Sequence, residues 1–233
     1  MNFEFTEEQR LFADAVHKFA VAELGADALK RAHNPRFPFD VAQRMSRQGL
    51  MGITLPEADG GQGGSLMDAV IAIEQVALVC PRSADVVQSG SFGPIRTFTE
   101  YASPSLKSSY LPDLLAGRTV MSLGMSEPDA GSAVTDLKTT AKPEGAHYVI
   151  NGTKVFSTFS PDAAVFLVYA RFGPGIGGIG SVVVARDTPG FRIGQPSSLS
   201  AISANFHCRP WNSHNGRPNC TRVATWSRAL LKA

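Results

Sequence analysis

The sequence predicts an α+β protein with several domains: an N-terminal all-α helical domain followed by a small antiparallel β-barrel domain. Apolar residues recur at helical spacing as far as residue 116, and short apolar runs separated by turn residues then continue to residue 196. From residue 197 onward the chain contains no Asp or Glu. We therefore divide the chain into residues 1–116, 117–196 and 197–233. We expect the last segment to be an atypical basic tail, either disordered or produced by a frame-shift.

A capping signal opens the helical domain. Thr6 is followed three residues later by Gln9, and the acidic Glu7 and Glu8 lie between them. Apolar residues then recur on one helical face until Gly25, which can end the helix. The residues of this face are Phe12, Val16, Phe19, Ala20 and Leu24.

Four further helices are expected in this domain, over residues 39–48, from Ser65, over about 82–101 and over 104–116. Pro81 and Pro104 suit the first turn of the last two helices. The helix after Ser65 is apolar almost throughout, which predicts a helix buried inside a bundle. The Gly-rich residues 56–64 are expected to form a loop.

The β domain is predicted from period-two patterns and turn signals. Asn151-Gly152 lies between two strand-like runs, and this pair of residues favours a tight hairpin turn. Many short strands between turns predict a small barrel or sandwich. The expected strands are residues 120–125, 137–142, 147–150, 153–156, 165–171, 181–185 and 190–193.

Composition excludes several classes of protein. The chain has 22 basic and 20 acidic residues, so its net charge of +2 argues against nucleic acid as the main partner. Three cysteines at scattered positions predict neither a disulfide framework nor a zinc site, and we expect no metal. The odd cysteine count and the acidic N-terminus without a leader indicate the cytoplasm. No apolar run approaches the roughly 18 residues of a membrane span.

Two tempting motifs are rejected. Residues 175–180 spell a dinucleotide-binding glycine pattern, but a strand follows them instead of a helix, so we interpret them as a hairpin loop. Ser122, Ser126 and Ser132 lack the Gly-x-Ser-x-Gly context of a hydrolase nucleophile, and His147 lies on a strand.

Residues 121–132 are the richest segment, because a strand leads into a turn dense in Ser, Gly, Pro and acidic residues. Such a turn presents hydroxyl and backbone N–H groups to a polar ring edge or a phosphate. Ser126-Glu127-Pro128-Asp129-Ala130-Gly131-Ser132 resembles the flavin-binding signature of the acyl-CoA dehydrogenase family, roughly Thr/Ser-Glu-Pro-x-Ala-Gly-Ser. Residues 148–158 resemble the family's Asn-Gly-x-Lys-x-Trp/Phe segment, and residues 5–9 and 55–61 are also similar to it. The likeness covers residues 1 to about 196.

The resemblance implies FAD as cofactor and oxidation of acyl-CoA to 2,3-enoyl-CoA, with a carboxylate that removes the α-proton. It also implies a third, C-terminal helical bundle, which supplies the glutamate base in the family and which we expect to be missing here. Ala133, Phe156 and Phe159 depart from the usual Asp, Trp and Asn. The residues that the resemblance assigns to the flavin are Leu123, Met125, Ser126, Gly131, Ser132, Phe156, Ser157 and Thr158.

Two hypotheses remain open from the sequence. The first is an FAD-dependent acyl-CoA dehydrogenase, present as a truncated and catalytically incomplete copy. The second is a non-catalytic flavin- or acyl-CoA-binding module, or a subunit completed by a partner chain. Flavin monooxygenases and acyl-CoA oxidases share the fold and also stay open. The resemblance implies acyl-CoA as substrate, which Ser132 would also contact, electron-transfer flavoprotein as acceptor, and a homo-oligomer. No carboxylate is assigned as base, and Glu127 is interpreted as a solvated residue or a cap.

Overall fold

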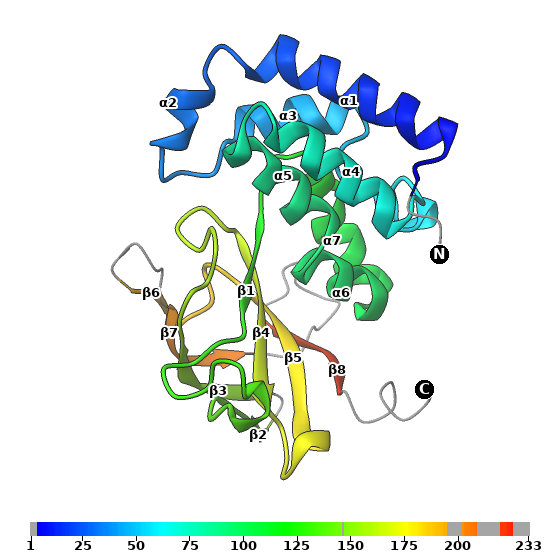
Figure 1. Cartoon of the computed structure of the whole chain (residues 1–233). Coiled ribbons are helices and arrows are strands. Elements are labelled where there is room, and N and C mark those ends of the chain that lie inside the picture. Colours follow the sequence, from blue (N-terminus) through cyan, green and yellow to red (C-terminus); the bar gives the residue numbers. More distant parts are fainter. Residues whose placement is uncertain (1–3, 146, 195–201, 209–219, 226–233) are drawn as a thin grey trace. The chain divides into compact units, whose positions relative to one another are not determined.

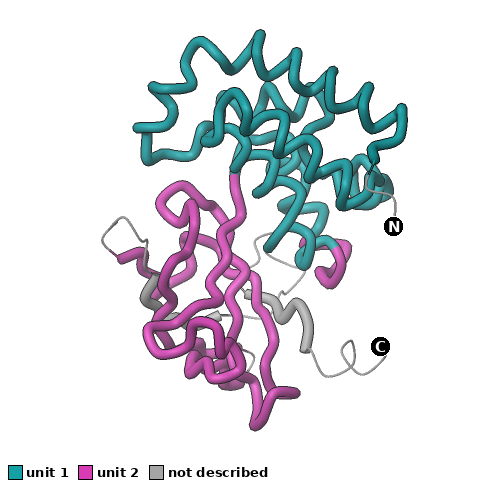
Figure 2. The backbone as a smooth tube through the Cα atoms, in the orientation of Figure 1, with its two compact units in different colours: residues 1–99, 107–119 teal, residues 100–106, 120–233 magenta. Residues whose placement is uncertain are grey.

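The computed structural model describes residues 4–145, 147–194, 202–208 and 220–225. The chain forms two compact units, residues 1–99 with 107–119 and residues 100–106 with 120–233 (Figure 2). The first unit is helical and the second is built on a sheet. The predicted fold class, helices followed by a β domain, is therefore confirmed.

Seven α-helices lie within the described residues (Figure 1). A buried stripe on α1 contacts α4, and α5 lies against α2, α3 and α4. No helix in the described part of the chain is long and apolar enough to cross a membrane. The helices are α1 (Glu7–Leu24), α2 (Ala28–Ala32), α3 (Phe39–Arg47), α4 (Leu66–Ala77), α5 (Pro81–Ser91), α6 (Pro94–Tyr101) and α7 (Pro104–Leu115).

Helix α1 forms as its sequence predicts. The Thr6 hydroxyl accepts a hydrogen bond from the Gln9 amide at 3.2 Å, and the Gln9 side chain accepts one from the Thr6 amide at 3.0 Å. Val16, Ala20 and Leu24 are buried, and their spacing of four residues places them on one face of the helix. Local capping and a single apolar stripe thus account for this helix.

The helix predicted over residues 82–101 is two helices, α5 and α6. Phe92 is extended, and Gly93 adopts a left-handed φ of 65°. Pro94 then opens α6, where its missing N–H costs nothing. The break therefore follows from Gly93 and Pro94, which the apolar pattern alone does not reveal.

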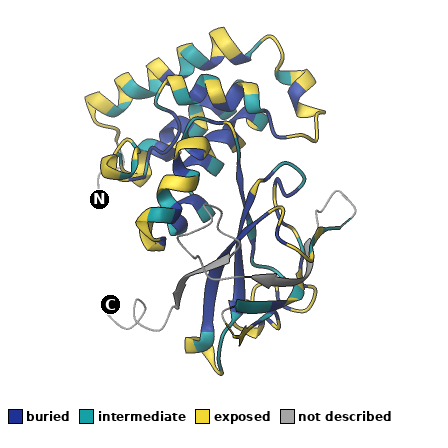
Figure 3. Cartoon of the chain, turned by 180° about the vertical axis from the view of Figure 1, so that it is seen from behind, coloured by how far each residue is buried: buried dark blue, intermediate teal, exposed yellow. Residues whose placement is uncertain are grey.

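Helix α4 is not buried on all sides, so that expectation is wrong. Ala69, Ile71, Ala72 and Val76 are buried. Leu66, Met67 and Val70 of the same helix are about half exposed. Figure 3 shows in yellow the exposed residues of the described part of the chain.

The second unit is one sheet with strand order β6-β7-β3-β2-β4-β5-β8, and β1 pairs with β4. Strands β4 and β5 are buried along nearly their whole length and form its core. The strands are β1 (Met121–Gly124), β2 (Thr140–Glu144), β3 (His147–Lys154), β4 (Val165–Arg171), β5 (Ile179–Ala185), β6 (Phe191–Ile193), β7 (Ile202–Cys208) and β8 (Cys220–Thr225).

The sheet is mixed and not purely antiparallel. Strand β1 runs parallel to β4, with Met121 opposite Val165, and β2 also meets β4 in parallel at Thr140. Parallel strands need a long connection. Here the chain forms the β2–β3 hairpin after β1 and before β4, so the connection is long enough. Residues 172–178 join β4 to β5 as a hairpin loop, as predicted for the glycine-rich string.

The predicted turn at Asn151-Gly152 is wrong, because β3 continues through both residues. Asn151 pairs with Thr140 on β2 and with Asn205 on β7, and the turn between β2 and β3 lies at Gly145, with φ 58°. A Cβ at Gly152 would lie 2.6 Å from the Thr139 Cβ, so the glycine permits close backbone approach.

The sheet extends past residue 196, where we set the end of the β domain. Strand β7 pairs with β3 and β6, and β8 pairs with β5. Most of the basic residues of the expected tail and both of its tryptophans, Trp211 and Trp226, lie outside the described residues.

Candidate functional site

Two loops of the sheet unit, one after β1 and one after β3, are joined by hydrogen bonds. Residues 125–139 follow β1, and residues 155–164 follow β3. The Val155 amide donates to the Ser126 carbonyl at 2.9 Å. The Ser122 hydroxyl donates to the Thr158 carbonyl at 2.7 Å. The two motifs recognised in the sequence therefore form one surface.

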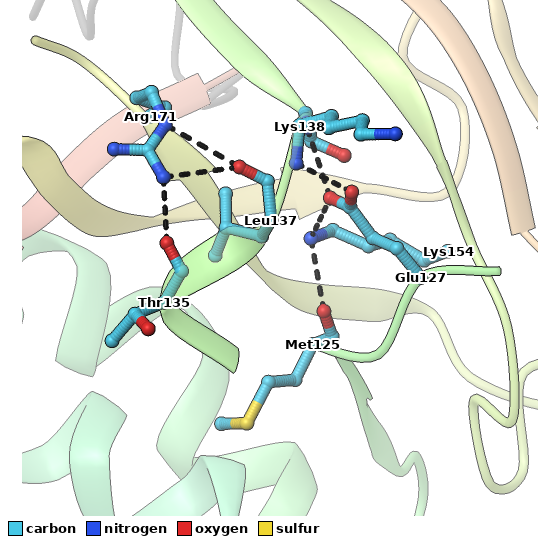
Figure 4. Close-up of polar contacts among 8 residues, drawn as sticks. Met125, Glu127, Thr135, Leu137, Lys138, Lys154 and Arg171 are labelled. Carbon is cyan, nitrogen blue, oxygen red and sulfur yellow. Dashed lines mark hydrogen bonds and ion pairs between the residues drawn. The ribbon is translucent and has the colours of Figure 1, made fainter. Parts of the chain in front are cut away.

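A buried ion pair lies beneath this surface (Figure 4). Lys154 Nζ lies 2.7 Å from Glu127 Oε1, and the side chains are 3% and 5% exposed. The same ammonium donates to the Met125 carbonyl at 3.0 Å. The interpretation of Glu127 as a solvated residue or a cap is therefore wrong.

Three donors hold the Glu127 carboxylate. Besides Lys154, the Thr139 amide donates to Oε1 at 2.9 Å and the Lys138 amide to Oε2 at 2.6 Å. These two amides donate to the carboxylate and not to a neighbouring strand. This explains why β2 begins at Thr140 and not at the predicted residue 137.

The ionised form of Glu127 is favoured. Burial raises the pKa of the carboxyl, but the hydrogen bonds from Lys154, Thr139 and the backbone outweigh burial and lower its pKa to about 2. Burial lowers the pKa of Lys154, and Glu127 opposes that shift. A carboxylate held by three donors is a poor proton acceptor at neutral pH.

The far end of the first loop is fixed by Arg171, at the end of β4. Its guanidinium donates to the carbonyls of Thr135 at 2.7 Å, Leu137 at 3.2 Å and Gly175 at 2.8 Å. Residues 128–136 lie between Glu127 and Leu137, which is held by Arg171, and they are exposed apart from Ala130.

Phe156 is the most unusual residue of the surface. It is 56% exposed, and its backbone has a left-handed φ of 57°. A bulky residue rarely adopts this conformation, which clusters at functional sites. Its ring is a large apolar face presented outward from the end of β3.

The other residues expected to contact a flavin differ in exposure. Gly131, Ser132 and Thr158 are exposed, whereas Leu123, Met125 and Ser126 are half-buried. Ser157 is fully buried, and its hydroxyl has no hydrogen-bond partner among the described residues. Its side chain therefore does not reach the surface formed by the others.

Two hydroxyls of the same loops have no hydrogen-bond partner among the described residues. Within the part of the chain that the structure describes, the hydroxyls of Ser126 and Thr158 make no hydrogen bond to protein. An exposed aromatic ring and free hydroxyls on two hydrogen-bonded loops suit a flat heterocycle with a polar edge. No group of three potential metal ligands occurs among the described residues.

Comparisons with known proteins match both units. The family model described as the acyl-CoA dehydrogenase N-terminal domain matches residues 6–118, and the middle-domain model matches residues 122–210. The likeness thus continues beyond residue 196.

Individual relatives give the same picture. The short-chain specific acyl-CoA dehydrogenase of Clostridium acetobutylicum is 31% identical over 207 residues, which is 88% of this chain and 55% of the relative. The solved structure of PigA with FAD is 25% identical with a TM-score of 0.82, over 90% of this chain and 58% of that one. A structure described as the electron transferring flavoprotein of Acidaminococcus fermentans is also 25% identical, with a TM-score of 0.79, over 90% and 58%. The chain spans about half the length of the curated relatives it matches.

Proposed function

Because the chain belongs to the acyl-CoA dehydrogenase family, we propose that it binds FAD on the surface formed by the loops after β1 and β3. The observation that carries this proposal is the joining of the two motifs by the Val155–Ser126 and Ser122–Thr158 hydrogen bonds. These bonds join two loops into one surface that carries the exposed Phe156 ring.

The exposed groups fit a flavin. The Phe156 ring offers a packing face to the isoalloxazine, and the free hydroxyls of Ser126 and Thr158 can hydrogen-bond its polar edge. Gly131 and Ser132 would line the cofactor in the exposed stretch, and Leu123 and Met125 would support it from below. Ser157 is assigned to contact through its backbone, because its side chain is buried.

Bound FAD would accept the hydride that leaves the β-carbon of an acyl-CoA thioester. The chain's own residues hold and orient the ring and shield one of its faces from water. Ser132, exposed beside the flavin segment, is proposed to contact the substrate as well. Electron-transfer flavoprotein is the proposed acceptor.

Removal of the α-proton needs a base, and Glu127 does not fit that role. It is buried and already accepts hydrogen bonds from Lys154 and two amides. We propose no base among the described carboxylates. Dehydrogenation is therefore assigned to the chain only when a further segment or a partner supplies the carboxylate.

FAD titration followed by flavin fluorescence tests the proposal. We expect saturable binding, weaker in Ser126→Ala and Thr158→Val by about 1 kcal/mol each, since each loses one hydrogen bond. Phe156→Ala should lose about 1–3 kcal/mol of binding free energy. Absence of binding at about 1 mM FAD would refute the proposal.

Tyr148→Phe is the matched control for this titration. Tyr148 lies on β3 and is not among the residues assigned to the flavin. Its ring packs edge-on against Phe172, with the ring centroids 5.6 Å apart. The substitution keeps the ring, so FAD affinity should stay at the parent value. A loss equal to that of Phe156→Ala would show that the variants act through general damage to the sheet.

A further inference from the structure

We propose that Glu127 and Lys154 are positioning residues, and that their buried pair fixes the spacing of the two loops that form the flavin surface. This inference rests on the proposed function, because the loops matter as the two halves of that surface. Neither residue was assigned to the cofactor by the sequence motifs.

The pair bridges the loops at the point where they meet. Lys154 is the last residue of β3, and its ammonium holds both Glu127 Oε1 and the Met125 carbonyl of the other loop. The next residue, Val155, makes the backbone bond to Ser126. Phe156 follows immediately, so the placement of its ring depends on this junction.

Glu127 also organises its own loop. Its carboxylate spans from Lys154 to the amides of Lys138 and Thr139. Glu127 and Ala130 exchange backbone hydrogen bonds at 3.0 and 3.2 Å, which closes a tight turn. Arg171 fixes the loop further along at Thr135 and Leu137 (Figure 4). The exposed stretch that carries Gly131 and Ser132 is thus held on both sides.

The chemistry of the pair favours positioning over stability. A buried ion pair often contributes little net stability compared with apolar residues of similar size, because desolvation offsets the attraction. Its directional hydrogen bonds nevertheless specify one geometry, which apolar side chains do not. Replacing both residues should therefore preserve folding while releasing the loops.

The test uses the double variant Glu127→Met/Lys154→Met and the single variant Glu127→Gln. We expect the double variant to keep a cooperative thermal transition but to bind FAD about tenfold more weakly. The visible circular dichroism of its bound flavin should change, since the ring surroundings change. Amide exchange at Val155, Lys138 and Thr139 should be about tenfold faster than in the parent.

Lys138→Met is the matched control. Lys138 lies in the same loop and pairs with Asp129 at 2.9 Å, but both side chains are more than 70% exposed. Its removal should leave the FAD dissociation constant, the flavin spectrum and the Val155 exchange unchanged.

The results distinguish a positioning role of the pair from its absence. Parent-like FAD affinity and parent-like Val155 exchange in the double variant would overturn the positioning role, as would an equal effect of Lys138→Met. If the double variant does not fold, Glu127→Gln, which keeps the shape of the side chain, decides by the same readouts. If the parent chain binds no FAD, the proposed function fails, and the exchange at Val155, Lys138 and Thr139 alone decides whether the pair fixes the loops.

Discussion

Phe156 combines exposure and an unfavourable backbone conformation. A left-handed φ places the Cβ of an L-residue close to its own backbone, and an exposed ring returns little packing energy. Such a residue persists when the surrounding structure holds it, here through the Ser126–Val155 and Ser122–Thr158 bonds on either side. The conformation presents the ring to the surface where the flavin is proposed.

Phe156→Asn should therefore raise the free energy of unfolding while weakening FAD binding. Asn tolerates the left-handed region, so the free energy of unfolding should rise by about 0.5–1 kcal/mol. The same variant lacks the ring and should bind FAD more weakly. Urea denaturation and FAD titration of one sample check both halves. A destabilised Asn variant would show that Phe156 packs more tightly than its exposure indicates.

The pH dependence of stability should report on Glu127. Its folded-state pKa of about 2 lies below its ordinary value of 4.5. The unfolded chain therefore binds more protons between these values, and the stabilisation, complete above pH 4.5, is lost as the pH falls toward 2. The shift corresponds to about 3 kcal/mol.

Urea denaturation across this range checks the prediction. Between pH 7 and pH 2, Glu127→Gln should lose about 3 kcal/mol less unfolding free energy than the parent does. Asp129→Asn, at an exposed carboxylate in the same loop, should lose about as much as the parent. Equal slopes in Glu127→Gln and the parent would mean that other carboxylates govern acid unfolding.

Some helices and strands follow from their local sequence, whereas in strand β3 pairing with neighbouring strands overrides the local signal. The helix α1 cap and the ends of α3 and β1 follow from neighbouring residues, so the sequence predicts them closely. Asn151-Gly152 is a strong turn signal, yet the pairing of β3 with β2 and β7 keeps it extended. The two segments proposed to bind the flavin could be identified from their motifs. The Glu127–Lys154 pair was not, because two residues distant in sequence meet only in the folded sheet.

Gly152→Ala should be strongly destabilising. A Cβ there would lie 2.6 Å from Thr139 Cβ and 2.8 Å from its Cα, so backbone must shift. We expect a loss of about 1–3 kcal/mol in the free energy of unfolding. Gly131→Ala, where no atom lies within 4 Å of the added Cβ, is the control and should unfold like the parent. A tolerated Gly152→Ala would contradict the continuous strand.

At the scale of the whole molecule, the middle-domain likeness runs to residue 210, while acidic residues stop before residue 197. The match to residue 210 argues against a frame-shift at residue 197, so we propose a shifted reading frame only for the stretch after residue 210. Resequencing the region that encodes residues 190–233 tests this proposal. A next frame without an acidic, family-like continuation would end that proposal.

We also predict that this chain alone does not dehydrogenate acyl-CoA. Without an assigned base, this chain alone should not reduce a dye with butyryl-CoA or palmitoyl-CoA, because general-base catalysis is worth about 10²–10⁴-fold. Steady turnover by the purified chain would mean that one of its own carboxylates removes the α-proton. Turnover only after addition of a second chain would favour a subunit completed by a partner.

Amide hydrogen exchange with and without saturating FAD would locate the cofactor on the chain. We expect FAD to slow exchange in two separate segments, residues 125–132 and 155–158, with little change along α1 to α5. Protection confined to the helical unit, or protection of one of the two loops without the other, would contradict a flavin surface made jointly by both.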